Sequence, residues 1–140
     1  MPQPLANAQG THAVLLVEDD ASIQSMLVTL LQDEGFLVVT ARDGAAAIRL
    51  LDAHSPPPEH FCVVVIDMML PMVSGLDVLA HLTRVGKVPV VAMSASREQL
   101  ARAVLAGADI AIAKPFDIEH LLNQILAAVA NHCPQEHGSP

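Results

Sequence analysis

The stretch from residue 63 to residue 75 constrains the fold of this chain more than any other. Residues 63–66 read Val-Val-Val-Ile, and this run ends in the carboxylate of Asp67. A loop containing Pro71 follows, and Gly75 opens a helical pattern. A short β-branched run without alternation is typical of a strand buried on both faces of a parallel sheet. We therefore expect Asp67 at the carboxyl end of such a strand, where open α/β sheets bind ligands. On its own, an Asp in this place can equally be a turn or helix-capping residue.

Length and composition limit the class of protein. The 140 residues suffice for one domain, and the near absence of aromatic side chains (three Phe, no Trp or Tyr) predicts an aliphatic core. A formal net charge of −8 argues against direct binding of nucleic acid. No apolar run reaches the length of a membrane span, and the start lacks the pattern of a signal peptide. Two cysteines do not make a disulfide framework, and the seven histidines lack metal-ligand spacing. We expect a cytoplasmic protein without a membrane anchor.

Strand and helix patterns alternate along the chain. Predicted strands cover residues 13–17, 36–40, 61–66, 89–93 and 109–113. Predicted helices run from a cap at Asp20 or Ser22 to Gly35, over 45–54, 75–84 and 97–106, and from the cap Asp117 to residue 130. Such alternation predicts a parallel sheet with helices on both faces. The fold class is therefore α/β, a doubly wound (βα)5 sandwich of flavodoxin-like topology with strand order 2-1-3-4-5.

The ends of the chain and one loop are expected to lie outside this core. Residues 1–11 are polar and contain prolines, which predicts a disordered segment, and residues 131–140 predict a flexible tail. Residues 12–130 then form the single domain. Pro56, Pro57 and Pro58 predict a stiff surface loop, because consecutive prolines favour the polyproline conformation.

Polar residues follow four of the five predicted strands. Glu18, Asp19 and Asp20 follow the first, Asp67 the third, Ser94 the fourth and Lys114 the fifth. In a parallel sheet all carboxyl ends lie on one edge, so we expect these groups to converge at the crevice beside the first and third strands. Each residue alone could be a helix cap or a surface turn. Their occurrence together at these strand ends favours one site.

The predicted site carries the groups needed for phosphoryl transfer. Clustered carboxylates repel one another unless a cation lies among them, and Mg²⁺ binds few carboxylates while keeping several waters. We expect Asp19 and Asp67 as carboxylate ligands, Glu18 acting through a metal-bound water, and the backbone carbonyl of Met69 as a further ligand. Lys114 and Ser94 would offer a charge and a hydrogen bond to an anion. An Asp carboxylate is also a competent covalent nucleophile for phosphate.

These residues resemble the receiver domain of two-component response regulators over about residues 11–130. The motifs are Val17-Glu18-Asp19-Asp20, Asp67 with Leu70-Pro71 and Gly75, Met93-Ser94-Ala95, and Lys114-Pro115-Phe116. The resemblance implies a phosphoprotein of a phosphorelay, in which Asp67 accepts a phosphoryl group from a histidine kinase or a histidine phosphotransfer protein. Phosphorylation would then switch the binding of an unidentified downstream effector protein.

The same resemblance implies a role for each matching residue. Glu18, Asp19, Asp67 and the carbonyl of Met69 would hold Mg²⁺. Ser94, with Ala95 beside it, would turn toward the phosphoryl group, Lys114 would contact it, and the bond from Lys114 to Pro115 is often cis in this family. Such a domain is not a turnover enzyme, although it catalyses its own phosphorylation and dephosphorylation.

One position departs from the family pattern. Receivers usually carry a Tyr or Phe three residues before the Lys, and this ring swings inward when the Ser or Thr moves. Here that position is Ala111. We expect the phosphorylation chemistry to survive and the conformational response to differ. The alternative is a receiver-fold interaction module that acts without phosphorylation.

Three further alternatives concern other classes of protein and the oligomeric state. An aspartyl phosphatase usually needs a second Asp two residues after the nucleophile, where this chain has Met69. A flavin protein of the same topology would need a phosphate-binding loop after the first strand, and residues 18–20 have the wrong charge for it. The apolar stripe of the last helix leaves two uses open, packing on the core or forming a homodimer; its members are Leu121, Leu122, Ile125 and Val129.

Overall fold

The predicted alternation of strands and helices is present in the part of the chain that the structure describes. The computed structural model describes residues 12–53, 61–85 and 88–132. The elements in chain order are β1 Ala13–Val17, α1 Ala21–Asp33, β2 Leu37–Ala41, α2 Gly44–Ala53, β3 Phe61–Asp67, α3 Gly75–Val85, β4 Val90–Ser94, α4 Arg97–Leu105, β5 Ile110–Ala113 and α5 Ile118–His132. The expectations for residues 1–11, the proline loop at 55–58 and the tail beyond residue 132 lie outside the described residues.

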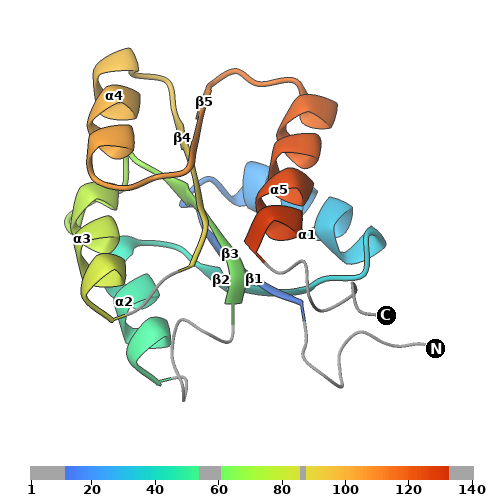
Figure 1. Cartoon of the computed structure of the whole chain (residues 1–140), viewed down its shortest axis with the longest axis horizontal. Coiled ribbons are helices and arrows are strands. Elements are labelled where there is room, and N and C mark those ends of the chain that lie inside the picture. The colour runs from blue at the N-terminus through green and yellow to red at the C-terminus, as the bar shows by residue number, and fades with distance from the viewer. Residues whose placement is uncertain (1–11, 54–60, 86–87, 133–140) are drawn as a thin grey trace.

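The sheet has the predicted topology. Its five strands are parallel and follow the order β2-β1-β3-β4-β5. Helices α1 and α5 cover one face of the sheet, and α2, α3 and α4 cover the other (Figure 1). This arrangement confirms the doubly wound α/β fold class. None of the helices in the described ranges is both long and apolar enough to span a lipid bilayer.

The core is aliphatic, as the composition predicts. All seven residues of β3 are buried, which agrees with a central strand covered on both faces. One apolar cluster lies between the sheet and α2, α3 and α4, and the other between the sheet and α1 and α5. Alternate residues of β3 serve the two clusters, because successive side chains of a strand point to opposite faces: Val64 packs in the first and Val65 in the second.

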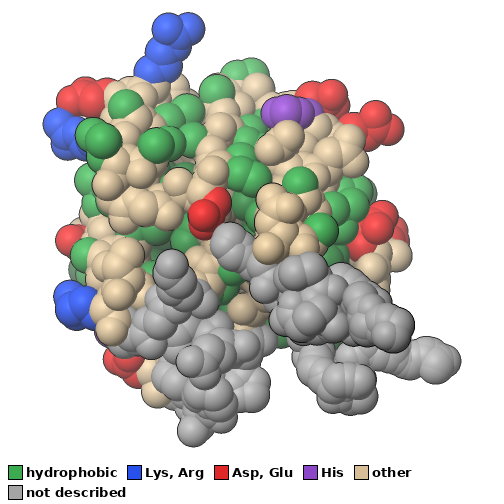
Figure 2. Space-filling model, in the orientation of Figure 1, with side chains coloured by type: hydrophobic (Ala, Val, Ile, Leu, Met, Phe, Trp, Pro, Cys, Tyr) green, Lys and Arg blue, Asp and Glu red, His purple; other side chains and the backbone are tan. Residues whose placement is uncertain are grey.

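The apolar stripe of α5 faces this core. Leu121, Ile125 and Val129 are buried, and Leu122 is half-buried against the same cluster. Exposed apolar side chains lie on another helix, and Figure 2 shows hydrophobic surface over α4. There Leu105 is 88% exposed. Packing on the core therefore accounts for the α5 stripe, and dimerisation through it stays an untested prediction.

Several element boundaries differ from the prediction by one or two residues. Strand β2 begins at Leu37 because the N–H of Phe36 still donates to Leu31 at the end of α1, after Gly35 at φ 96°. Asp109 precedes β5, since its carboxylate accepts a hydrogen bond from the N–H of Val90 at 2.8 Å. Helix α5 continues through residues 131 and 132, which the sequence assigned to the tail.

Two helix starts clarify the predicted caps. Asp20 caps α1, because its carboxylate accepts from the N–H groups of Ser22 and Ile23, whereas Ser22 lies within the helix. The helix predicted over residues 45–54 begins one residue earlier, since Gly44 is the first residue of α2. The carboxylate of Asp43 accepts from the N–H of Ala46 at 2.8 Å and so caps this helix.

Candidate functional site

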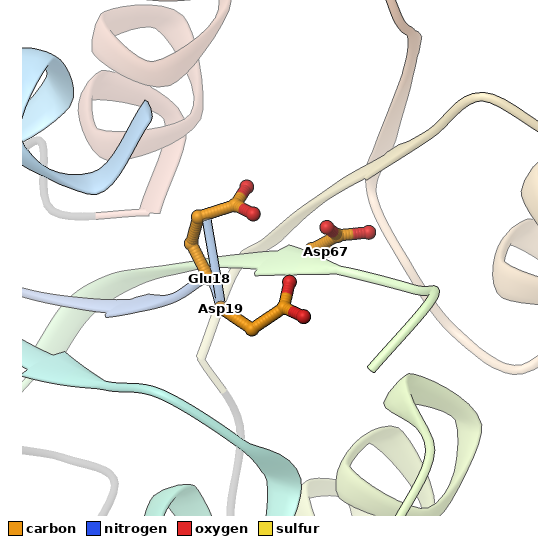
Figure 3. Close-up of side chains that lie close together, drawn as sticks. All are labelled: Glu18, Asp19 and Asp67. Carbon is orange, nitrogen blue, oxygen red and sulfur yellow. The ribbon is translucent and has the colours of Figure 1, made fainter. Parts of the chain in front are cut away.

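Three predicted acidic residues meet where β1 and β3 end. Val17, the last residue of β1, pairs with Ile66, so the residues that follow each of them lie side by side at the carboxyl edge. Glu18, Asp19 and Asp67 each offer a carboxylate oxygen, and these oxygens all lie within 4.8 Å of one another. Figure 3 shows the three carboxyl groups turned toward a common space. The structure therefore brings together the carboxylates that the sequence places at these two strand ends.

Burial divides this acidic cluster. Glu18 and Asp67 are 1% and 4% exposed, whereas Asp19 is exposed. Burial raises the pKa of Glu18 to about 7, and the negative charge of Asp67 acts in the same direction. The N–H of Asp20, which donates to Glu18 at 3.1 Å, and the charge of Lys114 partly offset this rise in the pKa. Glu18 thus resists ionisation in the absence of a metal.

Lys114, at the end of β5, provides the cation of the site. Its Nζ donates to Asp67 Oδ2 at 2.9 Å and to Glu18 Oε1 at 3.2 Å. Burial lowers the pKa of Lys114, but the hydrogen bond and charge of Asp67, together with those of Glu18, outweigh burial and raise the pKa above its usual value. The ammonium stays charged and offsets one of the nearby negative charges.

The donor set fits a hard divalent cation. Three carboxylates with one ammonium leave an excess of negative charge when all are ionised, and oxygen donors are the ligands that Mg²⁺ prefers. The raised pKa of buried Glu18 is consistent with this excess of negative charge, since a neighbouring cation would favour its ionised form. The residues present therefore fit the predicted metal.

Met69 approaches Asp67 through its backbone. The N–H of Met69 donates to Asp67 Oδ1 at 2.9 Å, and the residue is 55% exposed. Asp67 Oδ2 accepts from Lys114, so both carboxylate oxygens have hydrogen-bond partners. These two bonds fix the orientation of the Asp67 carboxylate at the end of β3.

The end of β4, which carries Ser94, lies beside the end of β3, which carries Asp67. Ser94 is fully buried, and its hydroxyl accepts a hydrogen bond from the N–H of Ser96 at 3.0 Å. The N–H of Lys114 donates to the carbonyl of Ser94 at 2.9 Å, which joins the β4–α4 and β5–α5 loops. Ala95 is exposed, and the peptide bond from Lys114 to Pro115 is cis. The loops after β4 and β5 are thus tied together at the site.

A pocket that the sequence did not indicate adjoins Lys114. It has a volume of about 500 Å³ and lies between the start of α1 and the β5–α5 loop. Apolar side chains form most of its wall, among them Ile23, Met26 and Phe116. Helical spacing predicts that Ile23 lies on the inward stripe of α1. Only the position of the β5–α5 loop in the structure shows that Ile23 also lines a pocket.

Ala111, where the sequence predicts an altered switch, lies on β5. Ala111 is half-buried and pairs in the sheet with Ala92 of β4. Two residues further along the strands, at the carboxyl edge, Ser94 pairs with Ala113. Small side chains therefore occupy the two adjacent strands at the position where receivers usually have an aromatic ring.

Comparisons with known proteins agree with this geometry. Residues 14–126 match the family model of the response regulator receiver domain. The chain is 35% identical over 116 residues to the transcriptional regulatory protein CpxR homolog of Haemophilus influenzae, which covers 81% of this chain and 48% of that protein. It is 38% identical over 122 residues to the alkaline phosphatase synthesis transcriptional regulatory protein SphR of Synechococcus elongatus, covering 82% and 48%.

The fold also matches solved receiver domains. The receiver domain of the Francisella response regulator 1452 superposes with a TM-score of 0.76 at 27% identity, covering 86% of this chain and 98% of that one. The chain spans about half the length of the curated relatives it matches. On the strength of the family match, the strand order and the acidic cluster, this chain belongs to the receiver domains of two-component response regulators.

Proposed function

We propose that this receiver domain accepts a phosphoryl group on Asp67, with Mg²⁺ bound, and that this modification switches the binding of a partner protein. The observation that carries the proposal is the geometry of Asp67. Its buried carboxylate ends β3, lies within 4.8 Å of two further carboxylates and accepts a hydrogen bond from Lys114 at 2.9 Å. A nucleophile, a metal ligand set and a fixed cation at one sheet edge suit phosphoryl transfer.

In the proposed reaction one carboxylate oxygen of Asp67 attacks phosphorus. The new oxygen–phosphorus bond forms while the phosphorus–nitrogen bond of the donor phosphohistidine breaks, and the electron pair of that bond leaves with the imidazole nitrogen. The ammonium of Lys114 offers its charge to the phosphoryl oxygens, and the Ser94 hydroxyl offers a hydrogen bond when it turns toward them. The Met69 N–H holds the other side of the Asp67 carboxylate.

The chain's own residues would hold the metal. Glu18, Asp19 and Asp67 supply carboxylate oxygens, directly or through water, and the carbonyl of Met69 is the proposed backbone ligand. When bound, Mg²⁺ would neutralise negative charge on the carboxylates and on the incoming phosphoryl group. The domain catalyses its own phosphorylation and dephosphorylation in this scheme and does not turn over a separate substrate.

The proposed partners follow from this chemistry. A protein phosphohistidine, on a histidine kinase or a histidine phosphotransfer protein, is the donor, and a separate effector protein responds to the modified domain. The names of the matched relatives describe them as transcriptional regulatory proteins, and those proteins are about twice as long as the matched region. We therefore propose the phosphoacceptor step for this domain and leave the effector unidentified.

Incubation with acetyl phosphate and Mg²⁺, followed by intact-mass measurement, tests the proposal. We expect wild-type protein to gain the mass of one phosphoryl group, and the Asp67→Asn variant to gain none. Asp33→Asn is a matched control, because Asp33 is exposed at the end of α1 outside the acidic cluster. No gain in the wild type, or an equal gain in Asp67→Asn, would contradict the proposal.

A second candidate is a receiver-fold interaction module that acts without phosphorylation. The observation in its favour is Ala111, since the residue that usually couples phosphorylation to the surface is replaced by a methyl group on β5. Pull-down from a cell extract with wild-type and Asp67→Asn proteins as bait, each with and without acetyl phosphate, separates the two. Equal capture in all four samples would support the second candidate.

A further inference from the structure

The loop between β3 and α3 carries a group on which the proposed site depends. It begins directly after Asp67, and its Met69 holds the Asp67 carboxylate through a hydrogen bond of 2.9 Å. In the proposed function the carbonyl of Met69 also faces the metal. A shift of this loop that reaches the Met69 peptide would move it relative to Asp67, and displacements on the order of 1 Å can cost about 100-fold in a catalytic step.

The start of α2 touches the far end of this loop. A Cβ atom added to Gly44 would lie 2.3 Å from the carbonyl oxygen of Val73 and 2.8 Å from its Cγ1. Both distances are far below van der Waals contact, so no residue larger than glycine fits unless the loop or the helix moves. The backbone of α2 and the β3–α3 loop thus meet through the missing side chain of Gly44.

Conformation does not explain glycine at this position. Among the described glycines, only Gly35 and Gly107 have a positive φ. Gly44 is the first residue of a helix, where other residues are readily accommodated. Close approach of two backbone segments is the remaining physical reason for glycine.

The near end of the loop is held in the same way. Gly75 opens α3, and a Cβ atom there would lie 2.8 Å from the Cα of Met68 and 2.9 Å from its Sδ. Between these contacts Leu70 is buried and Val73 is half-buried against the core cluster. Gly44 and Gly75, which begin α2 and α3, therefore pack closely against the two ends of the segment that contains Met69.

We propose that Gly44 is a positioning residue for the phosphoacceptor site, which it serves by letting the β3–α3 loop pack against α2 so that the Met69 peptide stays beside Asp67. The role rests on the proposed function of Asp67. Gly44 touches neither the donor nor the metal and acts through Val73 and the loop.

The test compares Gly44→Ala with Gly35→Ala in the full chain. Gly35 follows α1 at the opposite edge of the sheet, with φ 96° and nothing within 4 Å of an added Cβ. Alanine there strains the backbone and lowers stability without touching the site. The first readout is the Met69 amide resonance in ¹H–¹⁵N spectra of metal-free protein, and the second is Mg²⁺ affinity by calorimetry.

We expect Gly44→Ala to shift the Met69 amide and to weaken Mg²⁺ binding by about tenfold, in the range typical for losing a group that orients a ligand. Gly35→Ala should leave both unchanged even where the two variants lose similar stability. A Met69 amide or an Mg²⁺ affinity in Gly44→Ala equal to that of Gly35→Ala would overturn the proposal.

Two further arms keep the outcome clear. If wild-type protein binds no Mg²⁺, the proposed function fails, and the amide of Met69 in metal-free protein alone decides the role of Gly44. If Gly44→Ala does not fold, Val73→Ala removes the Cγ1 contact from the loop side. A shifted Met69 amide in Val73→Ala then supports the role, and an unchanged one overturns it.

Discussion

The ammonium of Lys114 lies 2.9 Å from Asp67 Oδ2, although the two residues are 47 positions apart in the chain. This ion pair joins the end of β5 to the end of β3 and is almost fully shielded, with side chains that are 18% and 6% exposed. In the metal-free domain Lys114 is the cation that allows buried Glu18 and Asp67 to lie side by side.

Replacing Lys114 with Met should destabilise the metal-free protein. The substitution leaves two buried carboxyl groups without their cation, and an uncompensated buried polar group typically costs about 1–3 kcal/mol. We expect the free energy of unfolding, measured with urea in the presence of a chelator, to fall by about this amount. Phosphorylation by acetyl phosphate should also slow, because a fixed positive charge for the phosphoryl oxygens is lost.

The control is Arg102→Met on α4. Arg102 pairs with Glu98 at 2.8 Å, but both side chains are more than half exposed. An exposed pair of this spacing contributes about 0.3–0.5 kcal/mol at most. Similar losses of stability in the two variants would show that the burial of the Lys114 pair has no energetic consequence.

Glu18 should give the metal-free protein a characteristic pH dependence. Burial raises its pKa from 4.5 to about 7, so the folded state binds the proton more tightly than the unfolded state does. The stability that this provides is fully present below about pH 4.5 and is lost as the pH rises through about 7. Relative to Glu18→Gln, the wild type should therefore become less stable between these two pH values.

The measurement is urea unfolding of both proteins in chelator at several pH values across this window. Taking the difference between the two curves removes the titration of the other groups, apart from those that touch Glu18. A constant difference across the window would mean that the pKa of Glu18 is the same in the folded and unfolded states.

Asp19 should have opposite effects with and without metal. It is the exposed member of the acidic cluster, and its charge repels Glu18 and Asp67 at short range. Asp19→Asn should raise the melting temperature in chelator, and it should remove most of the further rise that Mg²⁺ gives the wild type. A ligand present at about 100 times its Kd stabilises a protein by about 2.7 kcal/mol, so the wild-type increment is measurable.

Asp20→Asn provides the matched control for this prediction. Asp20 is the next residue and is also exposed, but its carboxylate caps α1 and lies outside the cluster. Asparagine caps helices about as well as aspartate, so the change removes a charge while keeping the cap. If Asp20→Asn abolished the Mg²⁺ increment as fully as Asp19→Asn, general charge reduction would explain both.

The sequence predicts those parts of the site that follow directly from the topology of the sheet. Residues that follow parallel strands must lie on one edge, so the meeting of Glu18, Asp67 and Lys114 could be predicted from strand ends alone. The bounds of β1 were also predicted correctly, since an apolar run that ends in acidic residues is a clear signal of a buried strand.

Contacts between backbones could not be predicted in this way. Asp43-Gly44 has the composition of a turn, and no local pattern shows that Val73 will lie against it. Burial of individual carboxylates is equally hidden, because Glu18 and Asp19 are neighbours in the chain and only the fold buries one and exposes the other. Phe36 was predicted as a strand residue, but its N–H donates to Leu31 at the end of the preceding helix. The sequence pattern does not show this hydrogen bond.

Ala111 gives a prediction about how the modified domain responds. The proposed phosphoryl site lies beside Ser94 and Lys114, whereas Ala111 carries only a methyl group on the half-buried side of β5. With Mg²⁺ and beryllofluoride, which imitates the phosphoryl group, we expect large amide shifts at residues 67–69 and 94–96 and at Lys114 and Phe116, and small ones at 110–112. A side chain without a ring cannot swing inward and carry the change along the strand. Asp67→Asn, given the same reagents, should show none of these shifts. Changes at 110–112 as large as those at Ser94 would mean that β5 rearranges without an aromatic residue.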